Sequence, residues 1–271
     1  MQDNKITGEQ NRLAILKWLH RFGWLTSRQI AELVWADKKS ALAMAQKTIA
    51  TMLESKLIIK RKLDSGSEAI LLSSKGASML NTELNVKAVS GAKLKLGNAT
   101  HRCASNYFLI QELAKGNAIF TEHEIQTGKS PVSACYGKIP DGLVIYDQGV
   151  FWLEVENSWK NINEREKIVQ FCADISSQPQ MIELWHNHFL YGVKILAITA
   201  FSAEAIVRTF AKFNNEGLIT DSALADIDLT YAPMTSGLIY ANATQVKNFH
   251  ILHNLIRPYN MGVPVKFNTL N

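Results

Sequence analysis

The sequence predicts an α+β or α/β protein with two domains, and three observations support this prediction. The chain has 271 residues, which is enough for two domains that each have a hydrophobic core. Residues 1–100 contain 16 Lys+Arg and 8 Asp+Glu, whereas residues 101–271 contain 13 and 16. Helical periodicity fills most of the basic part, and strand patterns alternate with helical ones in the mildly acidic part. We place the boundary near residue 95, with domains at 1–95 and 96–271.

Composition excludes several classes of protein. The apolar fraction is 47%, and no run of about 18 apolar residues could cross a bilayer. The polar start, "MQDNKITGEQ", lacks the apolar core of a signal peptide, so we expect a cytoplasmic protein without membrane insertion. Cys103, Cys135 and Cys172 lack CxxC spacing, so they indicate packing and neither a disulfide framework nor a zinc site.

The basic part begins with two predicted helices. The stretch "NRLAILKWLHRFG" repeats apolar residues at helical spacing and stops at Gly23. A second helix follows at once, because Thr26 and Gln29 have the spacing of a capping box ahead of Ile30.

A third helix and a hairpin complete this part. The helix is expected from about Ser40 to Ser55, and "LIIKRKLDSGSEAILL" predicts a hairpin with Ser65-Gly66 near its tip. Three helices and a basic hairpin predict a winged helix, whose third helix enters the DNA major groove. The candidate DNA-binding residues are Lys38, Lys39, Lys47, Thr48, Thr51, Lys60, Arg61 and Lys62. The alternative is a winged helix that serves protein contacts or packing.

The acidic part predicts a mixed sheet flanked by helices. A helix in "THRCASNYFLIQELAKG" precedes a strand in "AIFTEHEIQTG", which would place Glu122 and Glu124 on one face. An acidic hairpin, a helix through "INEREKIVQFCADIS", the strand "VKILAIT" and a helix capped at Ser202 follow.

Three acids in "KIPDGLVIYDQGVFWLEVENSWK" form the most informative pattern. Residues 147–149 predict a turn between two strands, with Gly149 able to adopt a positive φ. Folding about this turn places Asp141 opposite Glu154, or one residue away if the loop carries a bulge. Side chains alternate along a strand, so Glu154 and Glu156 share a face.

This pattern predicts a site for a divalent metal. Apolar residues surround the acids, and burying like charges together requires either a cation or protonation. Oxygen ligands favour Mg²⁺ or Mn²⁺ over zinc. The predicted third strand could bring Glu122 or Glu124 to the same cluster. The alternative is that one or more of the acids lies on a solvated sheet face.

These motifs resemble a known group of proteins. The helix, acidic hairpin and helix resemble the PD-(D/E)xK nuclease core, with Pro140-Asp141 as first element and Glu154-Val155-Glu156 as second. The preceding winged helix, "HRCASN" and "PDGLVI…FWLEVE" resemble the replication-relaxation and MobC-type plasmid mobilisation proteins over about residues 10–215. The resemblance implies a restriction-endonuclease-like fold and a relaxase, which nicks one strand at a plasmid transfer origin with a divalent cation. Asp141 and Glu154 would be metal ligands, with Glu122 or Glu124 in support.

One position departs from the family pattern. Glu156 occupies the place of the motif lysine, so Lys160, or less directly Lys167, could reach back to the site. Alternatively Glu156 is a further ligand and the metal activates the nucleophile without a lysine. A third alternative is a degenerate nuclease fold that only binds DNA.

Further candidate residues remain. His101 and Asn106 match the family's helix motif and are candidate site residues, although a hydrogen-bonded structural role is an alternative for His101. Gln170 is a candidate substrate contact or a solvated side chain. His186 and His188 have an H-x-H spacing but no visible third ligand. Trp152 and Trp159 indicate packing, with base stacking as an alternative. The nucleophile is either a tyrosine, among Tyr107, Tyr136 and Tyr146, or a metal-bound water.

Two functions therefore stand as expectations. One is the nicking relaxase, whose partners would be double-stranded and locally single-stranded plasmid DNA, a relaxosome accessory protein and a coupling protein. The other is a noncatalytic DNA-binding regulator or relaxosome accessory protein. The second function gives no reason for three acids to gather on an apolar hairpin.

Overall fold

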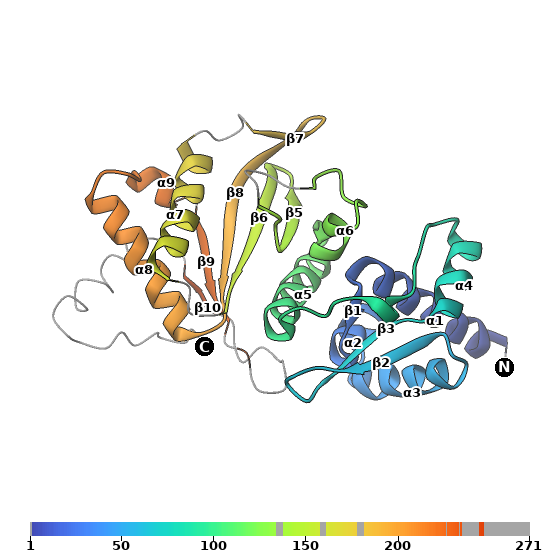
Figure 1. The fold of residues 1–271 in the computed structure, drawn as a ribbon. Coiled ribbons are helices and arrows are strands. Elements are labelled where there is room, and N and C mark those ends of the chain that lie inside the picture. Colours follow the sequence, from blue (N-terminus) through green and yellow to red (C-terminus); the bar gives the residue numbers. More distant parts are fainter. Residues whose placement is uncertain are drawn as a thin grey trace.

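The protein folds as an α+β chain with a mixed sheet flanked by helices (Figure 1). This coarse fold class was predicted and is confirmed. The structure is a computed structural model and describes residues 2–133, 138–157, 161–177, 182–225, 227–232, 234 and 244–246. None of the helices formed by these residues combines the length and the apolar character that a membrane crossing requires.

The first three helices are α1 (Gln2–Phe22), α2 (Ser27–Trp35) and α3 (Ala41–Glu54). The predicted capping box of α2 is confirmed, since the Thr26 hydroxyl accepts a hydrogen bond from the Gln29 backbone N–H and the Gln29 side chain accepts one from the Thr26 backbone N–H. Helix α1 begins earlier than its apolar repeat predicts.

A small antiparallel sheet follows the helices. The predicted hairpin is formed by β2 (Ile58–Lys62) and β3 (Glu68–Leu72), and the unpredicted β1 (Trp24–Leu25) pairs with β3. Strand β1 has two residues, too few for any periodicity to show. Helix α4 (Ser74–Leu84) and the short 3-10 helix η1 (Gly91–Lys93) complete this part.

The remaining elements build the larger sheet and its helices. In chain order they are α5 (Ala99–Ala114), β4 (Ala118–Thr121), α6 (Glu122–Gln126), β5 (Gly142–Tyr146), β6 (Gly149–Glu156), α7 (Ile162–Ser177), β7 (Glu183–Trp185), β8 (His188–Ala197), α8 (Ala200–Asn215), α9 (Asp221–Ala225), β9 (Asp228–Tyr231) and β10 (Thr244–Val246).

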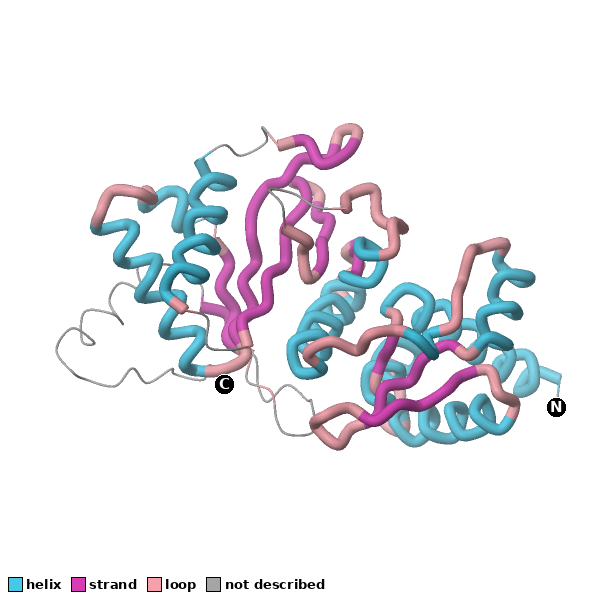
Figure 2. The backbone as a smooth tube through the Cα atoms, in the orientation of Figure 1, coloured by secondary structure: helices cyan, strands magenta, loops and turns pink. Residues whose placement is uncertain are grey.

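The larger sheet has the strand order β10-β9-β8-β6-β5-β4, with β7 paired to β8. Strands β4, β5 and β6 are antiparallel neighbours, whereas β6 with β8 and β8 with β9 are parallel. Parallel neighbours need crossover connections, and α7 and α8 provide them. Helices α7, α8 and α9 lie on one face of the sheet, and α5 lies on the other, toward the N-terminal part (Figures 1 and 2).

Alternation along β6 divides the core into two layers. Leu153 and Val155 belong to the apolar cluster on the α5 face, whereas Val150 and Trp152 belong to the cluster that includes residues of α7 and α8. The predicted alternation of β6 is therefore confirmed.

Two local predictions were wrong. The strand expected through Glu122 and Glu124 ends at Thr121, because the Thr121 side chain accepts from the Glu124 backbone N–H and starts α6 with a capping box. Helix α8 is capped at Thr199. Ser202, the predicted cap, is instead the third residue of the helix, and its side chain completes the capping box.

The predicted boundary near residue 95 lies in a connector that is held against the small sheet. Arg61 donates to the Leu94 carbonyl, Ser90 donates to the Leu72 carbonyl, and Asn81 exchanges two hydrogen bonds with the Ala88 backbone. The division into two domains stays a prediction.

Candidate functional site

The acidic hairpin has the predicted register. Gly142 pairs with Leu153 and Tyr146 with Gly149, so continuing the ladder by one residue puts Asp141 opposite Glu154. The Asp141 backbone N–H donates to the Leu153 carbonyl at 3.1 Å, and the Asp141 carboxylate accepts from the Val155 N–H at 2.8 Å. The backbone of β6 therefore fixes both ends of Asp141.

Glu154 and Glu156 are almost fully buried, with 7% and 1% of their surfaces exposed. One oxygen of Glu154, Oε1, accepts from Lys138 Nζ at 3.1 Å, and the other, Oε2, accepts from Trp152 Nε1 at 3.4 Å. A buried carboxylate is costly unless donors satisfy it, and these two groups supply that compensation.

Lys138 is a site residue that sequence reasoning missed. Its ammonium lies beside Glu154 and 5.5 Å from the centre of the Phe171 ring. Lys138 precedes Asp141 by three residues, and continuing the hairpin register would put it opposite Asn157, so no signal in the sequence indicated its contact with Glu154. A lysine therefore does stand beside the acids, although it comes from neither of the predicted positions.

His101 pairs with Asp141. Its Nε2 atom lies 2.8 Å from Asp141 Oδ1, and about a quarter of its side chain is exposed. Burial alone would lower the pKa of His101, but hydrogen bonds to Asp141 and Asn157 and the charges of Asp141 and Glu122 outweigh burial, so the pKa is raised. The structure thus brings the predicted His101 together with the predicted Asp141.

Helix α5 carries His101 as part of the motif "HRCASN". The Ser105 hydroxyl donates to the Asp141 carbonyl at 2.6 Å, which adds a second contact between α5 and Asp141. Asn106, a predicted candidate, donates to the Trp24 carbonyl at 3.2 Å instead. Asn106 therefore helps to join α5 to the N-terminal part, which is a structural role.

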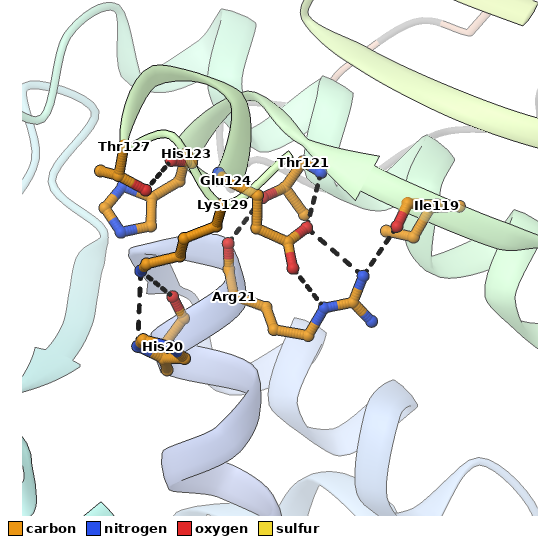
Figure 3. Close-up of polar contacts among 8 residues, drawn as sticks. All are labelled: His20, Arg21, Ile119, Thr121, His123, Glu124, Thr127 and Lys129. Atoms are coloured by element: carbon orange, nitrogen blue, oxygen red, sulfur yellow. Dashed lines mark hydrogen bonds and ion pairs between the residues drawn. The ribbon is translucent and has the colours of Figure 1, made fainter. Parts of the chain in front are cut away.

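Glu122 and Glu124 have other partners in the structure. Glu124 accepts from Arg21 Nε at 2.6 Å and caps α6 through Thr121 (Figure 3). Glu122 lies 3.5 Å from Arg102. Glu124 is therefore held in the junction between α6 and the N-terminal part, and Glu122 lies beside α5.

The acids fit a hard cation in the kind of ligand they offer. Asp141 and Glu154 supply carboxylate oxygens from neighbouring strands, which Mg²⁺ and Mn²⁺ prefer, and Glu156 is the next acid on the same face of β6. Within the described residues, no three His, Cys, Asp or Glu side chains are grouped closely enough to hold a metal ion. His101 and Lys138 are the present partners of Asp141 and Glu154, so a bound metal would share these carboxylates with them.

Several predicted residues lie elsewhere. Lys160, Trp159, Tyr136 and Cys135 are outside the described residues. Lys167 is exposed on α7, and Gln170 donates to Asp174 on the same helix. His188 stacks on Trp185 and contacts the His186 carbonyl, so both histidines belong to the β7–β8 turn.

Neither described tyrosine candidate adjoins the acids. Tyr107 is 3% exposed in an apolar cluster with Trp24 and Leu71, and burial raises its pKa. Tyr146 is at the end of β5 remote from Asp141, where it donates to Glu112. Burial, together with Glu112, also raises the pKa of Tyr146, which disfavours a phenolate nucleophile.

The predicted DNA-binding residues differ in availability. Exposed residues are Lys38, Lys39, Lys47, Thr51, Lys60 and Lys62, whereas Thr48 and Arg61 are partly buried. Lys60 pairs with Glu68 at 2.6 Å, and Arg61 is used to hold the connector at Leu94. Lys47 is the exposed cation on α3 itself.

Comparisons of the chain with protein family models, with curated proteins and with solved structures gave no match.

Proposed function

We propose that this chain is a metal-dependent, site- and strand-specific DNA-nicking relaxase that acts at a plasmid transfer origin. The observation that carries the proposal is the pairing of Asp141 and Glu154 across the β5–β6 hairpin, with His101 and Lys138 beside them. The order α5, acidic hairpin, α7 supports the resemblance to the PD-(D/E)xK core. The plasmid target and the accessory and coupling partners rest on the resemblance alone.

The N-terminal part serves as the DNA-binding module in this proposal. Three helices and the hairpin β2–β3 support a winged helix. A groove of about 470 Å³ separates the hairpin from α3, and Arg28, Gln46 and Lys60 line it. A phosphate backbone is a suitable ligand for such a surface, with Lys47 on α3 facing the groove of the duplex.

The acids and their partners define the chemistry. Bound Mg²⁺ or Mn²⁺, held by Asp141 and Glu154 with Glu156 in support, would polarise the scissile phosphate. Lys138 places a positive charge beside Glu154, where it would stabilise negative charge that develops on the phosphoryl oxygens. His101, whose raised pKa favours the imidazolium, is the group that can donate a proton to the leaving oxygen.

Asp141 orients His101 in this mechanism. The carboxylate is fixed by the Val155 N–H and its carbonyl by Ser105, so the imidazole partner is held at a defined position. Water and Tyr136 are the candidate nucleophiles in this proposal. Tyr107 and Tyr146 are disfavoured because burial raises their pKa values and neither adjoins Asp141.

One feature favours a second function. Asp141 already pairs with His101 and Glu154 with Lys138, and an acid stands where the motif lysine would be. A degenerate nuclease fold that acts as a noncatalytic DNA-binding regulator or relaxosome accessory protein would have these properties.

A plasmid assay separates the two functions. Supercoiled plasmid carrying the transfer region is incubated with the protein and its plasmid-encoded partners, in Mg²⁺, in Mn²⁺ and in EDTA. We expect open-circle product that requires metal, that Asp141→Asn abolishes and that Asp174→Asn, on the exposed face of α7, leaves unchanged. Asparagine keeps an acceptor for the Val155 N–H, so the variant should fold. Specific duplex binding without any nicking would favour the regulator.

A further inference from the structure

Buried hydrogen bonds join α5 to the N-terminal part. The Arg102 guanidinium donates to the Phe22 carbonyl at 3.1 Å, Asn106 donates to the Trp24 carbonyl at 3.2 Å, and Gln29 donates to the Cys103 carbonyl at 3.0 Å. All three donors are at most 6% exposed. A buried donor that loses its acceptor pays its full desolvation cost, so these bonds resist separation of the two parts.

A second set of bonds joins α6 and β4 to the end of α1 (Figure 3). Arg21 contacts both carboxylate oxygens of Glu124, at 2.6 and 3.3 Å, and donates to the Ile119 carbonyl at 2.7 Å. The Thr121 hydroxyl donates to the Arg21 carbonyl at 2.6 Å, and Lys129 contacts the His20 carbonyl at 3.3 Å. A bidentate arginine pair fixes orientation as well as distance.

Apolar packing is continuous across the same junction. One core cluster contains Leu16, Phe22 and Ile30 from the N-terminal part together with Phe108 and Val155 from the larger sheet and its helix. The connector between them is itself held to the small sheet by Arg61 and Ser90. Close-packed apolar surfaces leave little freedom for hinge motion.

Helix α5 also contacts the acidic hairpin. His101 and Ser105 bind the side chain and the carbonyl of Asp141, while Arg102 and Asn106, on the same helix, bind the N-terminal part. The helix thus has fixed contacts at both the DNA-binding module and the acids.

We propose that the N-terminal part and the acidic sheet move as one rigid body, so that duplex bound at α3 and β2–β3 presents one phosphodiester, at a fixed spacing, to Asp141. This inference rests on the proposed function, because it identifies the substrate as a duplex with recognition sequence and scissile bond at a set distance. A hinged protein would instead reach a range of phosphodiesters around the same bound sequence.

Directed cleavage tests the fixed spacing without relying on enzymatic activity. An iron chelate is attached at Lys138→Cys, in a chain with Cys135→Ser, since Cys103 and Cys172 are buried. The probe is a duplex that the protein has selected from a random library. We expect radical cuts confined to about half a helical turn, roughly 5 base pairs, at a constant offset from the protected sequence. Cuts spread over a full turn or more, or no sequence-selective binding, would overturn the inference.

Distance measurement gives a second test that needs no DNA cleavage. Spin labels at the exposed positions Glu83→Cys and Lys167→Cys, again with Cys135→Ser, report the separation of α4 and α7. A single narrow distance distribution, unchanged when the selected duplex is added, supports the rigid body. A broad or two-peaked distribution, or a shift on binding, contradicts it.

Junction variants provide the matched comparison. Glu124→Gln together with Asn106→Ala should widen the window of chelate cuts at least twofold and leave duplex affinity within about threefold. Glu204→Gln, which removes an exposed ion pair with Arg208 on α8, should leave the window unchanged.

If the wild type fails to nick while the chelate window stays narrow, the proposed function fails and the rigid body stands. If the wild type nicks in a reaction that requires Asp141 but the window of chelate cuts is wide, the proposed function stands and the rigid body fails.

Discussion

Two pairs of acids with the same spacing in sequence have different environments in the fold. Glu154 and Glu156 lie on a strand and share a buried face, and Lys138 lies beside Glu154. Glu122 and Glu124 lie in the first turn of α6. Glu122 pairs with Arg102, and Glu124 pairs with Arg21. An E-x-E spacing therefore does not by itself define a strand, because a threonine three residues before the second acid starts a helix.

The comparison also separates two uses of charge. At the hairpin, the register puts Asp141 opposite Glu154, and the proposed function uses both acids for phosphate chemistry. At α6, Glu124 is held by Arg21 in a junction between two parts of the chain (Figure 3). We expect the hairpin acids to control chemistry and the α6 acids to control stability.

The largest expected effect is on nicking. Under the proposed function, Asp141→Asn or Glu154→Gln should lower the nicking rate by about 10³-fold or more, since each would remove a group that stabilises the transition state. Glu122→Gln should change the rate by less than about threefold. The measurement is the initial rate of open-circle formation under saturating protein. Equal losses for all three variants would mean that the two acid pairs do not differ in role.

The cationic partner of the hairpin acids gives a smaller effect on the same rate. Lys138→Met keeps the length of the side chain but removes the charge beside Glu154, so nicking should fall by about 10²-fold, in the range found for single electrostatic groups. Duplex affinity should change little. Lys167→Met, on the exposed face of α7, is the control. A lower nicking rate for Lys167→Met, with no change for Lys138→Met, would indicate that Lys167 on α7 has the role of the motif lysine.

These comparisons show what the sequence could reveal. The capping box at Thr26 and Gln29 and the hairpin at 147–149 were predictable because their signals are local. Thr121 and Glu124 have a local capping-box spacing too, but the alternation of "AIFTEHEIQTG" favoured a strand, and the cap determined the outcome.

The partners of the acids were less accessible to sequence reasoning. Lys138 and Glu154 are 16 residues apart, and the strand register does not predict their contact. Arg21 and Glu124 are 103 residues apart, and no periodicity relates them. The pairing of His101 with Asp141 likewise depends on how α5 packs on the sheet. Long-range contacts decide these environments, and a single chain without its fold carries no direct signal of them.

Stability distinguishes the α6 acids from the hairpin acids. Glu124→Ala removes the partner of Arg21 and the cap of α6, so the free energy of unfolding should fall by about 2 to 3 kcal/mol. Glu124→Gln keeps the capping acceptor and should lose less. Urea unfolding measures both, and a double-mutant cycle with Arg21→Met isolates the pair. A loss below about 0.5 kcal/mol for Glu124→Ala would show that the pair does not hold the junction.

The smallest expected effect is a difference in how stability depends on pH. His101 at the hairpin and His123 at the junction should contribute to it in opposite directions. The pKa of His101 is raised, so its contribution to stability is fully present below about pH 6.5, the unfolded value, and is lost as pH rises through the folded value. Burial lowers the pKa of His123 to about 3, with Arg102, Lys129 and His20 adding to the shift, so its contribution is present above about pH 6.5 and is lost as pH falls toward 3. His101→Gln should therefore cost most at pH 6 and less at pH 9.

His123→Gln should have the opposite pH dependence. The neutral imidazole lies against Gly23 in the junction, and protonating it there is unfavourable. Replacing His123 should flatten the acid limb of wild-type stability by up to about 1.4 kcal/mol per pH unit below pH 6.5, the slope for one proton. Urea unfolding of both variants from pH 4 to 9 makes the comparison. Opposite slopes of unfolding free energy against pH require that the two histidines have folded pKa values shifted in opposite directions. Parallel curves for the two variants would therefore contradict opposite shifts at the hairpin and the junction.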